Sequence, residues 1–278
     1  MAGRVAEFEV LGPWSLGTSR RFWEGFTPPV LAGGPAGAGL RTVFCAEGDW
    51  CRAEAEVVQT GDTARVLLAG DGDLDAAARQ VCRFLALDVD GRGWPEVARR
   101  DPVIADVHAR LPGLRPCGFH SPYETAAWSV LAQRLRIVQA ARLRAELIAR
   151  HGEDGAFPPP RILSRLDLDL PGRKSEYLRA VAEAALDGLL DGAALRALDP
   201  GQAVQRVQQV KGLFKSLSCA NRHSARLPGW SSGSLMPHPN GGSGLVAAGS
   251  PLNLPALQLA ILSGLADRFP RGSARPPV

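Results

Sequence analysis

Basic side chains dominate one stretch in the middle of the chain. This stretch has a single opposing acid, Glu146. Its arginines are Arg134, Arg136, Arg142, Arg144 and Arg150. Such side chains can neutralise phosphate groups, which makes a phosphate-bearing partner one interpretation. The other interpretation is a helix face that meets only water.

Other residues that carry chemistry do not fall into known patterns. The five cysteines are scattered without a C-x-x-C pair, and His108 and His120 lack partners at metal-ligand spacing. Gly37 and Gly39 are followed by Thr42, where a dinucleotide-binding loop needs its third glycine. We therefore expect reduced cysteines, structural histidines and no metal site.

Net charge is uneven along the chain. The 278 residues carry +4, but residues 1–200 hold 24 basic and 27 acidic side chains, whereas residues 201–278 hold 8 and 1. No apolar stretch reaches the about 18 residues of a membrane span, and the acidic N-terminus lacks the apolar core of an export signal. We expect a cytoplasmic protein without a membrane partner.

Residues 1–90 have the pattern of a small mixed α/β domain. Short β-rich runs occupy residues 5–11, 42–45, 52–58 and 64–68, with Gly61-Asp62 as a turn between the last two. Asp73 predicts the start of a helix with apolar side chains at helical spacing. Residues 31–40 are rich in Gly and Ala and predict a loop.

Residues 91–212 predict an all-α domain, so the fold class is α+β. Ser121 and Pro122 supply an N-cap followed by proline at the first helical position. Further helices are expected at residues 137–151, 173–186, 191–198 and from 199 onward. Their lengths suit a compact domain rather than a coiled coil.

Residues 213–278 change composition again. Ser, Gly and Pro supply 26 of these 66 residues, and runs such as 231–234 have no hydrophobic period. Residues of this composition bury too little apolar surface to offset the entropy cost of ordering the chain. We therefore predict a low-complexity, disordered tail. We also expect Val204, Val207 and Val210 to form an apolar face without cover.

A series of short motifs runs in order through residues 80–212. The series consists of residues 81–90, 101–102, 113–116, 121–124, 130–133, 157–158, 170–178, 187–188 and 207–212. In this order the motifs resemble the DNA-3-methyladenine glycosylase II family of the helix-hairpin-helix superfamily. Residues 1–80 fit the family's small N-terminal domain only loosely.

The resemblance implies a monomer that acts in base-excision repair without a cofactor. Its partner would be double-stranded DNA with damaged bases, and the alkylated base would be extruded before its glycosidic bond is hydrolysed. A glycine-rich hairpin would grip the phosphate backbone, because glycine permits a close approach. An Asp beyond the hairpin would stabilise the sugar cation.

The resemblance also assigns positions that face DNA. Gln133 and Arg134 stand where the family inserts a wedge side chain into the emptied base stack. Lys174 opens a helix close to DNA, and Lys211 and Gly212 begin the hairpin that grips phosphate. A solvated helix end remains the alternative for Gln133 and Arg134.

Two aromatic residues are candidates for stacking on the flipped base. They are Tyr123 and Trp128, which lie on the first helix of the predicted all-α domain. An aromatic side chain at helical spacing can equally belong to the core, so both interpretations stay open.

The resemblance stops at residue 213. The second hairpin glycine, the following helix and the catalytic Asp of the family are missing, so the glycosylase-type domain is expected to be truncated and no catalytic residue is assigned. No acid lies between Asp199 and Asp267, and Asp267 is about 55 residues past Gly212. Our hypothesis is a reading-frame shift near codon 213, since GC-rich DNA read out of frame encodes few acids. A naturally divergent tail is the rival hypothesis.

The expected function is therefore base excision by descent, without activity in this chain. A DNA-binding remnant or pseudoenzyme without catalysis is the second hypothesis. An unrelated α+β interaction protein is the third.

Overall fold

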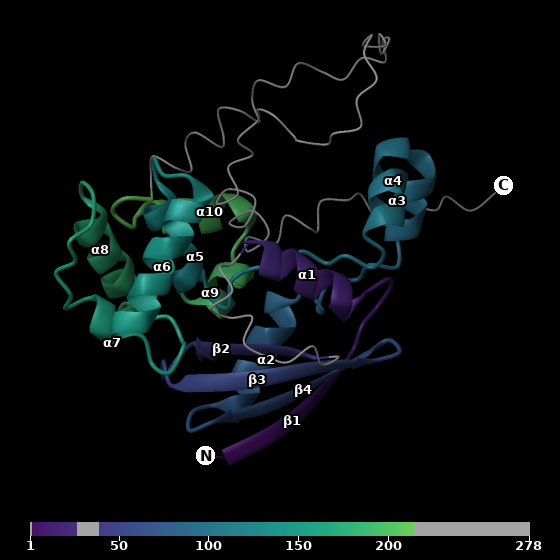
Figure 1. Ribbon diagram of the computed structural model, residues 1–278, viewed down its shortest axis with the longest axis horizontal. Coiled ribbons are helices and arrows are strands. Elements are labelled where there is room, and N and C mark those ends of the chain that lie inside the picture. The colour runs from purple at the N-terminus through teal and green to yellow at the C-terminus, as the bar shows by residue number, and fades with distance from the viewer. Residues whose placement is uncertain (1, 27–38, 214–278) are drawn as a thin grey trace, which may run out of the picture.

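The fold is mixed α+β, with one antiparallel sheet and a body of helices (Figure 1). The computed structural model describes residues 2–26 and 39–213. Four strands pair in the order β1-β4-β3-β2. They are β1 (Ala2–Glu9), β2 (Leu40–Cys45), β3 (Arg52–Thr60) and β4 (Thr63–Gly70). The predicted strands are therefore confirmed. β2, β3 and β4 are longer than predicted, whereas β1 lies earlier than the predicted residues 5–11.

Local capping chemistry explains where several elements begin. Gly61 has a φ of 58° in the tight turn that joins β3 to β4, a conformation that glycine adopts without steric cost. Asp73 caps α2 (Leu74–Phe84) by accepting hydrogen bonds from the backbone N–H groups of Asp75 and Ala76 at 3.0 and 2.9 Å. Both signals were predicted from the sequence and are confirmed.

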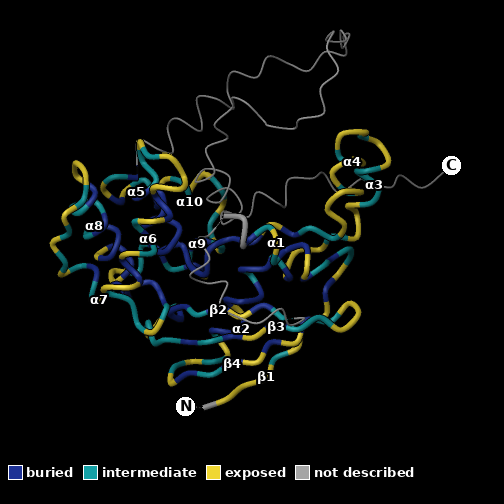
Figure 2. Tube along the Cα trace, viewed as in Figure 1, coloured by how far each residue is buried: buried dark blue, intermediate teal, exposed yellow. Residues whose placement is uncertain are grey.

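Three helices of the first 110 residues were not anticipated individually. They are α1 (Leu16–Phe26), α3 (Trp94–Arg100) and α4 (Pro102–Arg110). Asp101 caps α4 ahead of Pro102, which is the same signal as Ser121 and Pro122. Neither α3 nor α4 contains a buried residue, and Figures 1 and 2 show the pair standing apart from the rest of the molecule.

The helical body starts at α5 (Pro122–Ala132) and continues with α6 (Ile137–His151) and α7 (Pro160–Leu163). It is completed by α8 (Lys174–Leu186), α9 (Gly192–Ala197) and α10 (Pro200–Gln208). The predicted bounds of α6 agree with the structure, whereas α8 begins one residue later than predicted.

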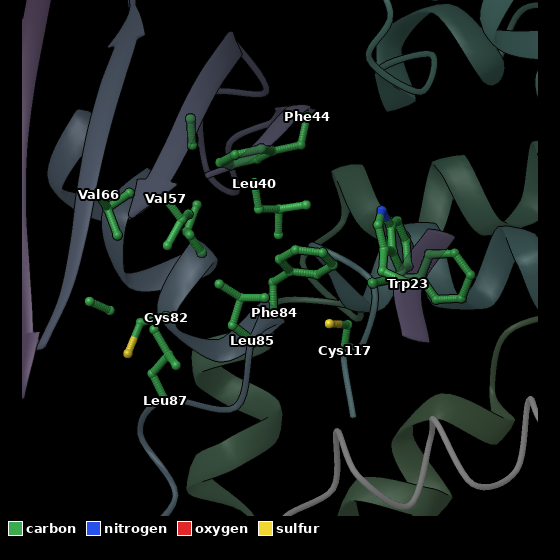
Figure 3. Close-up of a cluster of buried hydrophobic side chains, with 14 of the residues drawn as sticks. Trp23, Leu40, Phe44, Val57, Val66, Cys82, Phe84, Leu85, Leu87 and Cys117 are labelled. Carbon is green, nitrogen blue, oxygen red and sulfur yellow. The ribbon is translucent and has the colours of Figure 1, made fainter. Parts of the chain in front are cut away.

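Two hydrophobic clusters hold these elements together. The first joins the inner face of the sheet to α1 and α2, and it continues through Phe119 to Trp128 of α5. Figure 3 shows Phe84 of α2 facing Leu40 and Phe44 of β2, with Trp23 of α1 beside them. Side chains from beyond residue 90 thus complete the core under the sheet, so the first cluster crosses the boundary that the sequence suggested.

The second cluster fills the space among α5 to α10. Val207 and Val210 belong to it and are 6% and 3% exposed. Val204 is half-buried. The expectation of an uncovered face at these valines is therefore wrong, because the helical body itself covers them.

Expectations for the remaining residues lie outside the described ranges. They concern residues 31–38 of the predicted loop 31–40 and residues 214–278 of the predicted tail 213–278. Both predictions are wrong at their described ends, because Leu40 belongs to β2 and Leu213 is fully buried in the second cluster. Among the residues that the structure describes, no helix is long and apolar enough to cross a membrane.

A buried ion pair joins the first two helices of the helical body. Arg144 of α6 donates to the Glu124 carboxylate of α5 at 2.9 Å, and the side chains are 9% and 4% exposed. The Arg144 guanidinium lies 5.7 and 5.6 Å from the ring centroids of Phe119 and Phe157. Burial raises the pKa of Glu124, and Arg144 opposes that change. One arginine of the basic series is therefore a core residue.

A buried histidine connects the same pair to the sheet. The Nε2 atom of His120 is 2.8 Å from Oγ1 of Thr42 in β2, and the ring stacks against Phe44 and Phe84 at 4.6 and 4.2 Å. Its Nδ1 atom lies 3.8 Å from Glu124 Oε1 and has no hydrogen-bond partner among the described residues. The structural role expected for His120 is thus confirmed.

Replacing Arg144 by Met should destabilise the fold strongly. The substitution keeps the side chain's bulk but leaves Glu124 buried and unpaired, which typically costs about 3–5 kcal/mol. Urea denaturation would measure the loss. Arg142→Met is the matched control, since Arg142 is exposed on the same helix. Equal unfolding midpoints for the two variants would contradict the structural role of the ion pair.

Acid should destabilise the fold through His120. Burial lowers the pKa of His120 to about 3, and Arg144 adds to the effect. The unfolded chain has an ordinary histidine pKa of about 6.5, so below that pH only the unfolded state gains a proton. Stability should fall by about 2 kcal/mol between pH 7 and 5 from this group. Urea denaturation across that range would show a smaller loss for His120→Gln; an identical pH dependence would contradict this origin.

Candidate nucleic-acid interface

Three segments that are distant in sequence meet at one end of the helical body. They are the turn after α5, the first turn of α8 and the turn after α10. Gln133 Nε2 donates to the Gly212 carbonyl at 2.8 Å, which ties the first segment to the third. The Lys174 ammonium donates to the Gln133 carbonyl at 2.8 Å, which ties in the second. We call this surface, formed by residues 133–136, 173–177 and 211–212, the three-turn surface.

Lys174 holds the end of α5 in place. Its Nζ atom also donates to the carbonyls of Val130 and Leu131 at 2.7 and 3.0 Å. These carbonyls belong to the last turn of a helix, where backbone acceptors lack helical partners. Burial lowers the pKa of Lys174, with Arg134 as the next cause. The side chain is buried with its donors used, so the structure gives it a positioning role in place of the direct DNA contact that the sequence suggested.

Arg134 adopts a backbone conformation that few non-glycine residues tolerate. Its φ is 57° in the turn between α5 and α6, and its side chain is exposed. Holding such a residue in the left-handed region costs on the order of 1–3 kcal/mol and is common at functional sites. The turn therefore projects a cation outward at the position where the resemblance places a wedge.

Gly212 could not be replaced without moving its neighbour. Its φ is 96°, and a Cβ atom added to it would lie 2.5 Å from Tyr177 Cγ and 2.8 Å from Tyr177 Cβ. The glycine thus allows the backbone of the turn to lie directly against α8. Tyr177 is half-buried beneath it rather than fully within the core.

Lys211 shares an acidic partner with an arginine. Its Nζ atom lies 2.5 Å from Glu176 Oε1, and Arg173 donates to both oxygens of the same carboxylate at 2.6 and 2.7 Å. These hydrogen bonds, the one from Arg173 first, lower the pKa of Glu176 to about 2. Sequence reasoning did not select Arg173 or Glu176; the available signal was their i, i+3 spacing at a helix start.

The two aromatic candidates for base stacking lie inside the protein. Tyr123 is buried, and its hydroxyl donates to the Pro158 carbonyl at 2.7 Å. Trp128 is buried in the first cluster, with its ring centroid 5.9 Å from that of Phe119. Both therefore serve as core residues, and the stacking interpretation is corrected because neither ring is accessible.

The basic series divides into different environments. Arg134 and Arg136 are exposed within the three-turn surface, whereas Arg144 is buried. Arg142 and Arg150 are exposed farther along α6. Within residues 2–26 and 39–213, no group of three His, Cys, Asp or Glu side chains could hold a metal ion.

Comparison with curated proteins finds a relative among DNA repair enzymes. No family model matches the chain. The DNA-3-methyladenine glycosylase of Bacillus subtilis (strain 168) is 25% identical over 149 residues, which cover 49% of each protein. The chain thus matches about half the length of this relative.

Solved structures share the fold at low sequence identity. The 3-methyladenine DNA glycosylase from Archaeoglobus fulgidus superposes with a TM-score of 0.56 at 15% identity, covering 80% of this chain and 84% of that one. MBOgg1 in complex with a low-affinity DNA ligand gives a TM-score of 0.50 at 16% identity, over 76% and 75% of the two chains. In its motifs and its curated match, this chain is similar to the DNA-3-methyladenine glycosylases, and it shares the fold of a solved member.

Proposed function

We propose that this chain binds double-stranded DNA with damaged bases through the three-turn surface, as a monomer, without releasing the base. Its relatives are named as 3-methyladenine glycosylases, and MBOgg1 was solved with a DNA ligand. The observation that carries the proposal is the convergence of Gln133, Arg134, Lys211 and Gly212 on one surface.

The geometry of this surface suits a phosphate backbone. Arg134 and Lys211 are exposed cations, and Gly212 contributes a half-buried backbone turn without a side chain of its own. Exposed cations supply the sequence-independent part of DNA affinity, and backbone N–H groups fix the register. Lys174 and Gln133 supply rigidity, because their hydrogen bonds hold the three turns together.

Hydrolysis requires a carboxylate that this chain lacks at the family's position. The resemblance implies an Asp some two dozen residues past the hairpin, but the next acid after Asp199 is Asp267. A carboxylate stabilises the positive charge that develops on the sugar, so its loss removes a large part of catalysis. Binding without base release is therefore the expected behaviour. A functional glycosylase is the alternative, in which a carboxylate from elsewhere takes this role.

Duplex DNA carrying an alkylated base should be bound in a salt-dependent manner and left intact. Fluorescence anisotropy would measure binding, and strand cleavage after alkali treatment would report base release. Arg134→Ala should weaken binding and reduce the slope of log K against log salt by about 1. Arg142→Ala, an exposed arginine farther along α6, is the matched control.

Three results would separate the hypotheses. Base release above background would overturn the proposed inactivity and favour the functional glycosylase. If binding to the duplex changes neither with salt nor with Arg134→Ala, the DNA contact lies outside the three-turn surface. Absence of binding by folded protein would favour an unrelated interaction protein.

Gly212→Ala should weaken DNA binding more than a comparable change elsewhere. An alanine at this position meets the Tyr177 ring and the unfavourable φ of 96°, so the turn must move away from α8. Gly188→Ala is the matched control, because Gly188 has a φ of 74° at the opposite end of α8 with no atom near an added Cβ. Anisotropy titrations should show the larger loss for Gly212→Ala; equal losses would mean that only backbone strain matters.

A further inference from the structure

We propose that Glu176 is a built-in competitor of DNA phosphate, which holds Lys211 and Arg173 and thereby limits the affinity of the three-turn surface for duplex DNA. The inference rests on the proposed function and adds a residue that sets its strength. Its basis is one carboxylate placed between two cations on the surface that otherwise suits an anion.

The contacts occupy both oxygens of the carboxylate. Glu176 Oε1 receives the Lys211 ammonium and one Arg173 N–H, while Oε2 receives the Arg173 Nε–H at 2.6 Å. Lys211 comes from the turn after α10, so this contact connects two distant parts of the chain. A phosphate oxygen would offer the same two donors the same type of charge-assisted hydrogen bond.

All three side chains are open to solvent. Lys211 and Arg173 are 58% and 60% exposed, and Glu176 is 39% exposed. Ion pairs in such surroundings contribute only about 0–1 kcal/mol to stability. The carboxylate can therefore be exchanged for phosphate at small cost to the fold, but every exchange reduces the gain from binding DNA. Lys174 differs, since its buried ammonium meets only carbonyl oxygens.

Acid does not relieve this competition under working conditions. The hydrogen bonds from Arg173 and Lys211 lower the pKa of Glu176 to about 2, so the carboxylate is ionised at neutral and mildly acidic pH. To free Lys211 and Arg173, the Glu176 carboxylate must be displaced by another anion or neutralised by substitution. A substitution is therefore the appropriate test.

Glu176→Gln should strengthen duplex binding. The change removes one negative charge and leaves two cations to release their counterions on contact with phosphate. At about 100 mM salt, affinity should rise about three- to tenfold, and the slope of log K against log salt should steepen by about 1. Anisotropy titration of the full chain with a labelled duplex, across a salt series, measures both quantities.

A matched control lies on α3. Glu96 accepts hydrogen bonds from Arg99 and Arg100 and is 42% exposed, so it has the same arrangement of one carboxylate and two cations. The α3–α4 pair stands apart from the helical body (Figure 1). Glu96→Gln changes the net charge equally, and it should alter affinity less than twofold. In the double variant Glu176→Gln/Lys211→Gln, most of the gain should disappear.

The two proposals fail in different ways. If Arg134→Ala weakens binding but Glu176→Gln and Glu176→Ala bind no more tightly than the unchanged chain, the role of Glu176 is overturned and the DNA-binding surface stands. An equal gain from Glu96→Gln also overturns it, because net charge alone would explain the effect. If none of the proteins binds the duplex in a salt-dependent manner, both the DNA-binding surface and the role of Glu176 are overturned. A folding defect would lower affinity, which is opposite to the expected change.

Discussion

The buried Glu124–Arg144 ion pair is the constraint on which the arrangement of the molecule depends. A buried ion pair offsets its desolvation cost only when its geometry is good and its other polar atoms have partners. Here Arg144 lies near the faces of Phe119 and Phe157, and Glu124 lies beside His120. These groups come from the segment before α5, from α5 and α6, and from the segment between α6 and α7. The sheet, through Thr42 and Phe44, must close over them to keep out water.

The position of α5 follows from fixed charges at both of its ends. Glu124 in its first turn is held by Arg144, and the carbonyls of its last turn are held by Lys174. A cation at the C-terminal end of a helix is also favoured by the helix dipole. Because both ends are fixed, the turn that follows α5 has little freedom. That rigidity is what allows Arg134 to keep a left-handed backbone at the surface.

The sequence predicted elements whose signals are local. Asp73, the Gly61-Asp62 turn and the boundaries of α6 follow from chemistry within a few residues, and the structure confirms them. Burial of Arg144 could not be predicted in this way. Its spacing places it on the buried face of α6 with Ala141 and Leu147, but arginine is rarely buried without a partner, and its partner Glu124 lies 20 residues away. The sequence likewise predicts a surface cation at Lys174, because its acceptors, 41 to 44 residues away, become neighbours only in the folded chain.

Binding and hydrolysis make separate demands on such a fold. The turn after α10 is packed as far as Leu213, which is fully buried in the second cluster and whose N–H donates to the Val210 carbonyl at 3.2 Å. Gly212 is therefore held by side chains that precede it in sequence, chiefly Gln133 and Tyr177. The proposed recognition of phosphate would draw on this preorganised part. In the proposed function, base release would need a carboxylate at the sugar. The three-turn surface carries one carboxylate, Glu176, and it lies between the cations Arg173 and Lys211.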